Sequence, residues 1–411
     1  MKTVNGSSTI KSIIERYPVV KDVFAANGLS DLLEDEKLNK VGAFLTIKSA
    51  LKAKNKDLHV FLQMLSERIN SSGDGIDVTL VEKDSAQMTI IGHVPLPVRI
   101  QVLEAFEDFR VQLHEHEGFT LAGELAAGQE GTGLINEICK YKGDPRLLPD
   151  IIFAEGFNCL FGQPFRELFV DSDFFGRALP WDKKNIFEEI GLQDPQDNYN
   201  ILGIIPAVFI VDRKALNGRP EPRTWKDLLN WEYEKLIVMS SRNVAVYKSV
   251  ILTLYAQFGE EGVRTLARNT SLQLHPSEII KLFGSNKKVR PAISILPWFF
   301  SEMVEQTEDI SVIWPEDGAI VAPIFMLVKS DPEFYKTDPK NVEYGSSFFS
   351  SRQMGEILAK GCFPSLYSGI DNGLPDEASF QWVGWDFLSK MDSGSIIPQV
   401  YDLFDAEMGS R

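Results

Sequence analysis

The sequence predicts an α/β protein of two lobes, preceded by a small all-helical domain. Over the first 70 residues, apolar residues recur only at helical spacing, whereas from residue 88 onward apolar strands alternate with amphipathic helices. Strands separated by helices of this length form parallel or mixed sheets that helices cover on both faces. The span from residue 88 to residue 411 is too long for one such sheet, so we expect two lobes.

The N-terminal helices are marked by good start and stop signals. Thr9 is a favourable N-cap before the first apolar stripe, and Pro18 ends that helix. Further helices are predicted over about residues 19–27, 44–51 and 58–69. Turn-forming residues then replace the apolar periodicity. We therefore predict a helical domain over 1–70 and a linker over 71–87.

The two lobes follow from the order of strands and helices. Strands are predicted over residues 88–92, 120–122, 150–154, 201–211, 235–239, 292–296, 310–313 and 319–328. Helices are predicted over residues 97–114, 131–141, 246–258, 260–269 and 278–283. We expect the first lobe to comprise residues of about 88–212 and 318–411, and the second lobe to comprise residues of about 213–317.

Composition narrows the classes of function. The chain has 411 residues, of which 58 are acidic and 42 basic, so its formal charge is −16. A surface this acidic repels phosphate backbones and anionic lipids, which argues against nucleic acid or membrane binding. No apolar stretch reaches the ~20 residues that a transmembrane helix needs. We therefore expect neither a nucleic-acid partner nor a membrane span.

The cysteines and the N-terminus predict a cytoplasmic protein. Cys139, Cys159 and Cys362 are scattered and odd in number, so no disulfide or structural zinc site is readable from their spacing. Residues 1–12 lack the apolar core and cleavage site of a signal peptide. The alternative is a periplasmic or extracellular protein whose start is atypical.

Several segments, in the right order, resemble a known family from residue 88 onward. They are Thr89-Ile-Ile-Gly-His-Val-Pro-Leu-Pro97, Leu148-Pro-Asp-Ile-Ile-Phe-Ala-Glu-Gly-Phe157, Pro222-Arg-Thr-Trp-Lys-Asp-Leu-Leu229 and Trp314-Pro-Glu-Asp-Gly318. This part resembles the type II periplasmic solute-binding proteins of ABC transporters, most closely the iron(III)-type branch. The resemblance implies capture of a small solute between two lobes by hinge closure, an ABC permease as partner, and no catalysis.

The N-terminal helices resemble a different and smaller family. The segment Ile10-Lys-Ser-Ile-Ile-Glu-Arg-Tyr-Pro18 and the following Asn27-Gly-Leu29 are similar to the short helical domain found ahead of hybrid-cluster-type and iron–sulfur repair proteins. That family often has cysteines just after this glycine, and this chain has none there. We therefore expect the domain to dock a partner or to regulate rather than to hold a metal.

Candidate ligand residues follow the predicted strands, because ligands of two-lobed α/β proteins bind at the carboxyl ends of the strands. The first lobe offers a histidine, a helix-opening arginine, a carboxylate and an amide, and the second lobe offers hydroxyl, guanidinium and aromatic groups. The candidates are His93, Arg99, Glu155, Asn158, Ser240, Ser241, Arg242, Tyr247, Trp298 and Asp317. Each has a structural alternative, such as helix capping by the two serines, core packing by Trp298 or a turn at Asp317.

The chemistry of the ligand stays open between two classes. His93, Glu155 and Asp317 suit a bound metal or metal complex, whereas Arg242 and the helix N-termini suit an oxyanion or a carboxylate. No cofactor loop, nucleophile motif or zinc motif is present. Two alternatives to a transport receptor remain, namely an enzyme on the same fold that resembles pyrimidine-precursor synthases, and a ligand sensor that docks an intracellular partner through residues 1–70.

Overall fold

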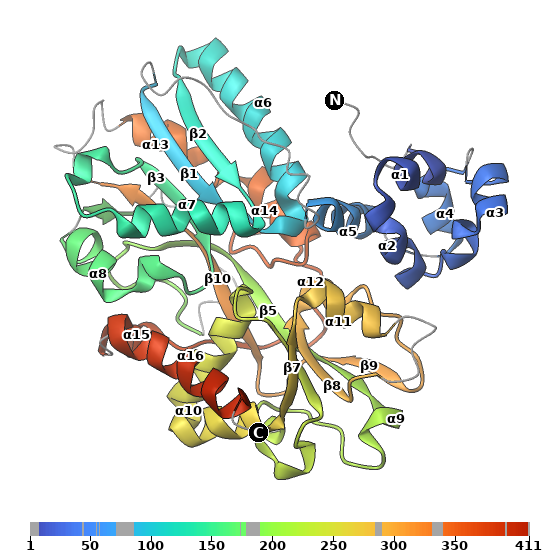
Figure 1. Cartoon of the computed structure of the whole chain (residues 1–411). Helices are drawn as coiled ribbons and strands as arrows, with labels where there is room; N and C mark the ends of the chain where they lie inside the picture. Colours follow the sequence, from blue (N-terminus) through green and yellow to red (C-terminus); the bar gives the residue numbers. More distant parts are fainter. Residues whose placement is uncertain are drawn as a thin grey trace.

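In the computed structural model, two α/β lobes stand one above the other and a helical domain lies beside them (Figure 1). The structure describes residues 8–42, 45–54, 56, 58–70, 86–172, 174–177, 190–283, 290–330, 340–390 and 393–409. Most of the predicted linker, and the first seven residues of the chain, lie outside the described residues.

The predicted helical domain is confirmed. Its α-helices are α1 (Ile10–Arg16), α2 (Lys21–Ala26), α3 (Asp35–Lys40), α4 (Ile47–Ala53) and α5 (Leu58–Asn70). The Thr9 hydroxyl accepts a hydrogen bond from the backbone N–H of Ser12 and so caps α1, as predicted. Phe24 and Phe61 pack edge to face with ring centroids 5.0 Å apart, and they form the centre of this small core.

The two lobes share one hydrogen-bonded sheet among the described residues, where the sequence predicted two. The strands are β1 (Met88–His93), β2 (Leu121–Ala126), β3 (Ile151–Glu155), β4 (Phe175–Gly176), β5 (Asn200–Asp212), β6 (Ile237–Ser240), β7 (Thr270–Leu274), β8 (Ile293–Pro297), β9 (Ile310–Ile313), β10 (Ala319–Lys329) and β11 (Phe380–Gln381). The order is β2-β1-β3-β10-β5-β8-β6-β7. The sheet is parallel within each lobe's core, and the antiparallel pair β5 and β10 joins the lobes.

The two crossing strands form the connection on which the lobes can move. Every residue of β5 and β10 is buried. Pro206 and Pro323 stand in the middle of these strands, where each removes one backbone donor, and the register shifts between Ile324 and Phe325. A ladder interrupted at its centre is more easily bent than a continuous one, which suits a hinge between two lobes.

Helices cover both faces of the sheet and extend past the last predicted strand. The main ones are α6 (Arg99–Glu117), α7 (Gly128–Lys140), α10 (Ala245–Asn269), α11 (Pro276–Leu282), α12 (Trp298–Ser301), α13 (Lys340–Ser347), α14 (Arg352–Lys360), α15 (Trp385–Lys390) and α16 (Ser393–Gly409). Gly259 has φ 64° and divides α10 into two helical parts. These parts correspond to the two helices predicted over residues 246–258 and 260–269. Helix α16 lies along α10 of the second lobe and also touches α8 (Gln163–Phe165), whereas the sequence-based boundaries assigned it to the first lobe.

The cysteine prediction needs a correction. Cys139 of α7 and Cys159, the first residue of a 3₁₀ turn (Cys159–Phe161), form a disulfide with their Cα atoms 6.0 Å apart. Their spacing of 20 residues matches no motif, so only the packing of the helix against the turn brings them together. No helix in the described part of the chain is long and apolar enough to cross a bilayer.

Candidate functional site

Two of the predicted ligand residues meet at the carboxyl edge of the first lobe's sheet. His93 is the last residue of β1 and Glu155 is the last residue of β3, and these neighbouring strands run parallel. The His93 Nε2 atom lies 3.8 Å from the Glu155 Oε1 atom, and the two side chains are only 13% and 17% exposed. The structure therefore brings together the two residues that follow the most clearly predicted strands.

Burial makes this pair electrically neutral near pH 7. It raises the pKa of Glu155 to about 8, because the ionised carboxylate loses its water. It lowers the pKa of His93 to about 4, with a further contribution from the positive charge of Lys248. A protonated carboxyl group donates a hydrogen bond, and a neutral imidazole donates through one nitrogen and accepts through the other.

Lys248 is a further candidate residue that the sequence analysis missed. It lies in the first turn of α10, on the second lobe, and its charge acts on His93 of the first lobe. Burial lowers the pKa of its ammonium, and the charge of Arg242 lowers it further. Within the described residues, this ammonium makes no hydrogen bond and no ion pair. A lysine in the first turn of a helix opposes the helix dipole, and that was the signal available in the sequence.

Two glycines allow the backbone to approach the cluster formed by His93, Glu155 and Lys248. A Cβ atom on Gly131 of α7 would lie 2.3 Å from the His93 Cδ2 atom, so only glycine lets the helix pass so close to the imidazole. Gly156 has φ 68°, and a Cβ atom there would lie 2.8 Å from the Cβ atom of Ala245 in the second lobe. The lobes are therefore in van der Waals contact beside His93 and Glu155.

Arg242 and Tyr247 are engaged by the C-terminal helix. The Arg242 guanidinium donates to Asp405 (2.8 Å) and Asp402 (3.0 Å) of α16. The Tyr247 hydroxyl donates to Asp405 (3.1 Å). Arg242 was predicted as a clamp for an anionic ligand, and in this structure two carboxylates of the chain itself occupy its guanidinium.

Ser240 and Ser241 do not cap α10, so helix capping, the structural alternative given for them from the sequence, is corrected. The helix begins after Val244, which has no capping side chain. Ser240 is fully buried and donates to the carbonyl of Ile295, whereas the Ser241 hydroxyl donates to the side chain of Asn243. Both hydroxyls therefore serve local structure.

The remaining first-lobe candidates are Asn158 and Arg99. The Asn158 side chain donates to the Glu155 carbonyl and accepts from the N–H of Leu160, so it shapes the loop that follows β3. Arg99 is buried and is the first residue of α6.

In the second lobe, Trp298 is buried. It donates a hydrogen bond to Glu302 and packs edge to face on Trp314, as expected if its role is core packing.

Asp317, the third candidate metal ligand, is engaged by the backbone of the second lobe in this structure. Its carboxylate accepts the backbone N–H of Trp225 at 3.0 and 3.2 Å. Glu155 has His93 as its neighbour, so the carboxylates of Glu155 and Asp317 have different partners in this structure. No group of three His, Cys, Asp or Glu side chains suited to a metal ion occurs in the described ranges.

Comparisons with known proteins agree with this architecture. Residues 147–391 match a family profile described as bacterial extracellular solute-binding protein, and residues 4–62 match a domain of unknown function, DUF1858. No curated protein matches the chain.

Solved structures share the fold at low sequence identity. The ferric binding protein from Campylobacter jejuni is 12% identical with a TM-score of 0.50, covering 78% of this chain and 99% of its own. A Trichodesmium protein in complex with iron and citrate is 14% identical with a TM-score of 0.53 and coverages of 78% and 98%. The substrate-binding protein of an ABC transporter from Agrobacterium tumefaciens is 12% identical with a TM-score of 0.52 and coverages of 80% and 100%. With more than half of its residues matched by the profile and its two lobes joined by β5 and β10, the chain belongs to the bacterial extracellular solute-binding protein family.

Proposed function

We propose that the chain captures a small anionic solute between its lobes, at a site formed by His93, Glu155 and Lys248. The proposal rests on the His93–Glu155 pair at the carboxyl edge of the first lobe and on the ammonium of Lys248 on the second lobe, whose charge acts on His93 and which has no hydrogen-bond or ion-pair partner among the described residues. With Glu155 protonated and His93 neutral near pH 7, the charge of the cluster is that of the Lys248 ammonium. An anion would receive one charge-assisted hydrogen bond from Lys248 and neutral hydrogen bonds from the first lobe.

The surrounding backbone supports an anion over a bare cation. Helix α7 begins at Gly128 and passes against His93, and α10 begins at Ala245 next to Gly156. The free N–H groups at a helix N-terminus favour negative charge. A metal ion is the weaker candidate, because no group of three His, Cys, Asp or Glu side chains suited to a metal ion occurs among the residues that the structure describes. A metal bound within an anionic complex is included in the experiment below, since one structural neighbour was solved with iron and citrate.

A screen of anions by thermal unfolding tests the proposal. Phosphate, sulfate, acetate, citrate and ferric citrate are compared with sodium chloride at equal ionic strength and pH 7. We expect one of the anions to raise the unfolding temperature progressively with its concentration, because a ligand at 100 times its Kd stabilises by about 2.7 kcal/mol. Stabilisation by divalent cations alone, with no response to any anion, would contradict the anion assignment.

The role in transport is part of the same proposal. The family to which the chain belongs is described as extracellular, and capture by hinge closure followed by release to an ABC permease is the function that this fold supports. The matched family profile is described as a solute-binding protein, which favours binding over catalysis. Steady-state consumption of any anion that binds would favour the enzyme alternative instead.

The disulfide between Cys139 and Cys159 supports a place of action outside the cytoplasm, where disulfides persist. We expect the double variant Cys139→Ser/Cys159→Ser to lose roughly 3 kcal/mol of stability, because the bond closes a loop of about 20 residues. Chemical denaturation without reductant measures the loss, and Cys362→Ser is the matched control because Cys362 is outside the disulfide. Alkylation of the unfolded, unreduced protein should modify one thiol per chain, and modification of three would refute the bond.

A further inference from the structure

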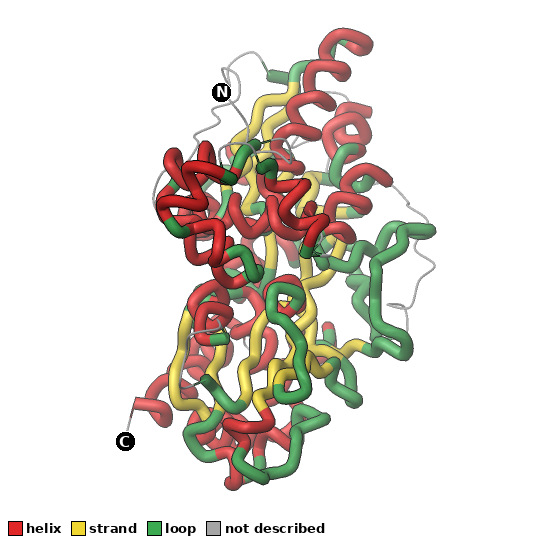
Figure 2. The backbone as a smooth tube through the Cα atoms, turned by 90° about the vertical axis from the view of Figure 1, so that its right-hand side faces the viewer, coloured by secondary structure: helices red, strands yellow, loops and turns green. Residues whose placement is uncertain are grey.

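The helical N-terminal domain touches both lobes. Its helix α5 packs against the 3₁₀ turn Leu96–Val98 of the first lobe, and its helix α2 packs against α11 of the second lobe. Figures 1 and 2, drawn at right angles, both show these helices beside the level at which the two lobes meet. The turn Leu96–Val98 follows His93 by only three residues, so the domain rests on a segment that leaves the candidate site.

The carboxylate of Asp22 connects three helices at this contact, namely α2, α5 and α11. The Asp22 Oδ2 atom of α2 lies 2.8 Å from the Arg68 Nε atom of α5 and 2.9 Å from the Lys281 Nζ atom of α11. All three side chains are only a quarter to a third exposed. Asp22 therefore holds α5 and the second lobe at once.

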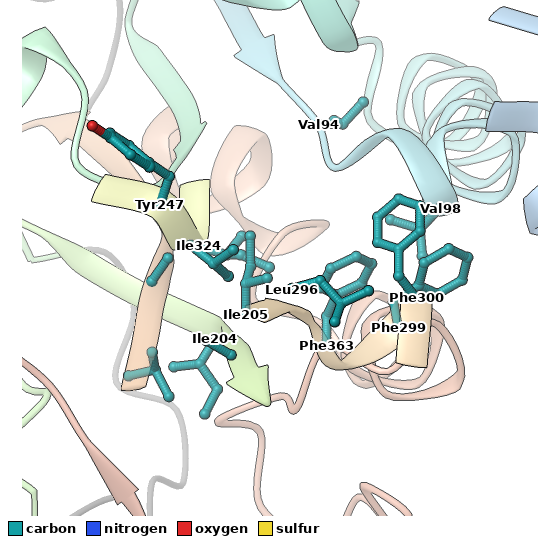
Figure 3. Packing of buried hydrophobic residues seen from close by; sticks show 14 of the residues in the cluster. Val94, Val98, Ile204, Ile205, Tyr247, Leu296, Phe299, Phe300, Ile324 and Phe363 are labelled. Atoms are coloured by element: carbon teal, nitrogen blue, oxygen red, sulfur yellow. The ribbon is translucent and has the colours of Figure 1, made fainter. Parts of the chain in front are cut away.

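The contact also includes an apolar part that spans the lobes. Val98 of the first lobe and Phe300 of the second belong to one buried hydrophobic cluster (Figure 3). Phe300 also lines a half-open pocket of about 40 Å³ together with Ala26 and Met64 of the domain. The helical domain and the second lobe therefore share an apolar-lined pocket at this contact.

We propose that residues 8–70 act as an intramolecular clamp, which holds the two lobes together when docked and has to leave at least one lobe before they can separate. The consequence for solute exchange rests on the proposed function, whereas the clamp itself does not. Opening the hinge changes the relative position of the turn Leu96–Val98 and α11, and a domain docked on both resists that movement. A molecule that captured α2 or α5 would therefore release the lobes.

Hydrogen–deuterium exchange of the full chain, without any solute, tests the clamp. Lys281→Glu places a negative charge beside Asp22 and leaves the helical domain itself unchanged. We expect about fivefold faster exchange in peptides covering residues 93–98 of the first lobe and residues 245–248 at the lobe contact. Lys226→Glu, the same charge change at an exposed lysine of the second lobe, should leave both peptides at wild-type rates.

The peptides in which exchange becomes faster decide whether the clamp proposal stands. Faster exchange confined to α2 and α11 would overturn the clamp, because the domain would then rest on the second lobe alone. Lys281→Gln, a milder change, should give a smaller increase in the same peptides, and a wild-type pattern in both variants would also overturn the proposal. Since no solute is present, a failed anion screen leaves this result intact, and a failed clamp leaves the anion site intact.

Discussion

Replacing Lys248 by methionine is expected to weaken anion binding roughly 10- to 100-fold. The substitution removes the only charge of the proposed site while it keeps a side chain of similar length. A hydrogen bond to a charged group contributes about 1.5–3 kcal/mol, which corresponds to that loss of affinity. Isothermal titration calorimetry with the anion that most stabilises the wild-type protein measures the change. Lys226→Met removes a charge from the exposed surface of the same lobe and should bind as the wild type does.

The same variant should be at least as stable as the wild type. The Lys248 ammonium is partly withdrawn from water without a hydrogen-bond or ion-pair partner among the described residues, and such a group costs free energy in the folded state. Weaker binding combined with unchanged or higher resistance to urea would distinguish a binding residue from a structural one. Wild-type affinity in Lys248→Met would remove Lys248 from the site.

The stability of the protein is expected to fall between pH 6.5 and pH 8 because of Glu155. Its pKa is raised to about 8 in the folded chain, above the ordinary value of 4.5, so the folded state holds a proton that the unfolded state has already lost. Stability therefore decreases as pH rises through this window, by about 1.4 kcal/mol per pH unit or about 2 kcal/mol in all. Urea denaturation at the two pH values measures this loss.

His93 acts in the opposite direction at lower pH. Its folded pKa of about 4 lies below the ordinary value of 6.5, so its contribution to stability increases as pH rises from 4 to 6.5. The two groups largely cancel between pH 4.5 and 6.5, and of this pair only Glu155 titrates above pH 6.5. Glu155→Gln should abolish the decline above pH 6.5, and an equal decline in the variant would show that another group causes it.

Local signals were sufficient for most of the candidate site on the first lobe. A run of apolar residues that ends in His93 or Glu155 identifies both a buried strand and the polar group at its carboxyl edge, because strand burial can be read from neighbouring residues. The neutrality of the pair could not be predicted in this way. It depends on how completely the second lobe and α7 exclude water from the two side chains.

Residues of the second lobe were harder to assign. Arg242 and Asp317 have the right chemistry and the right place after a strand, but Asp402, Asp405 and the N–H of Trp225 engage them. Asp402 and Asp405 lie about 160 residues from Arg242 in the sequence. A pairing at such separation leaves no trace in local periodicity, so a free and an occupied guanidinium look alike in the sequence.

The sequence by itself determined the helical domain, the alternation of strands and helices in two lobes, and the family, since each depends on spacing and order within short segments. Tertiary structure alone decided four other features: the disulfide between Cys139 and Cys159, the single sheet through β5 and β10, the action of the Lys248 charge on His93, and the contact of the helical domain with both lobes. All four join residues or segments that are distant in sequence, or cross from one unit to another. Such contacts are set by the packing of whole elements, which no local pattern records.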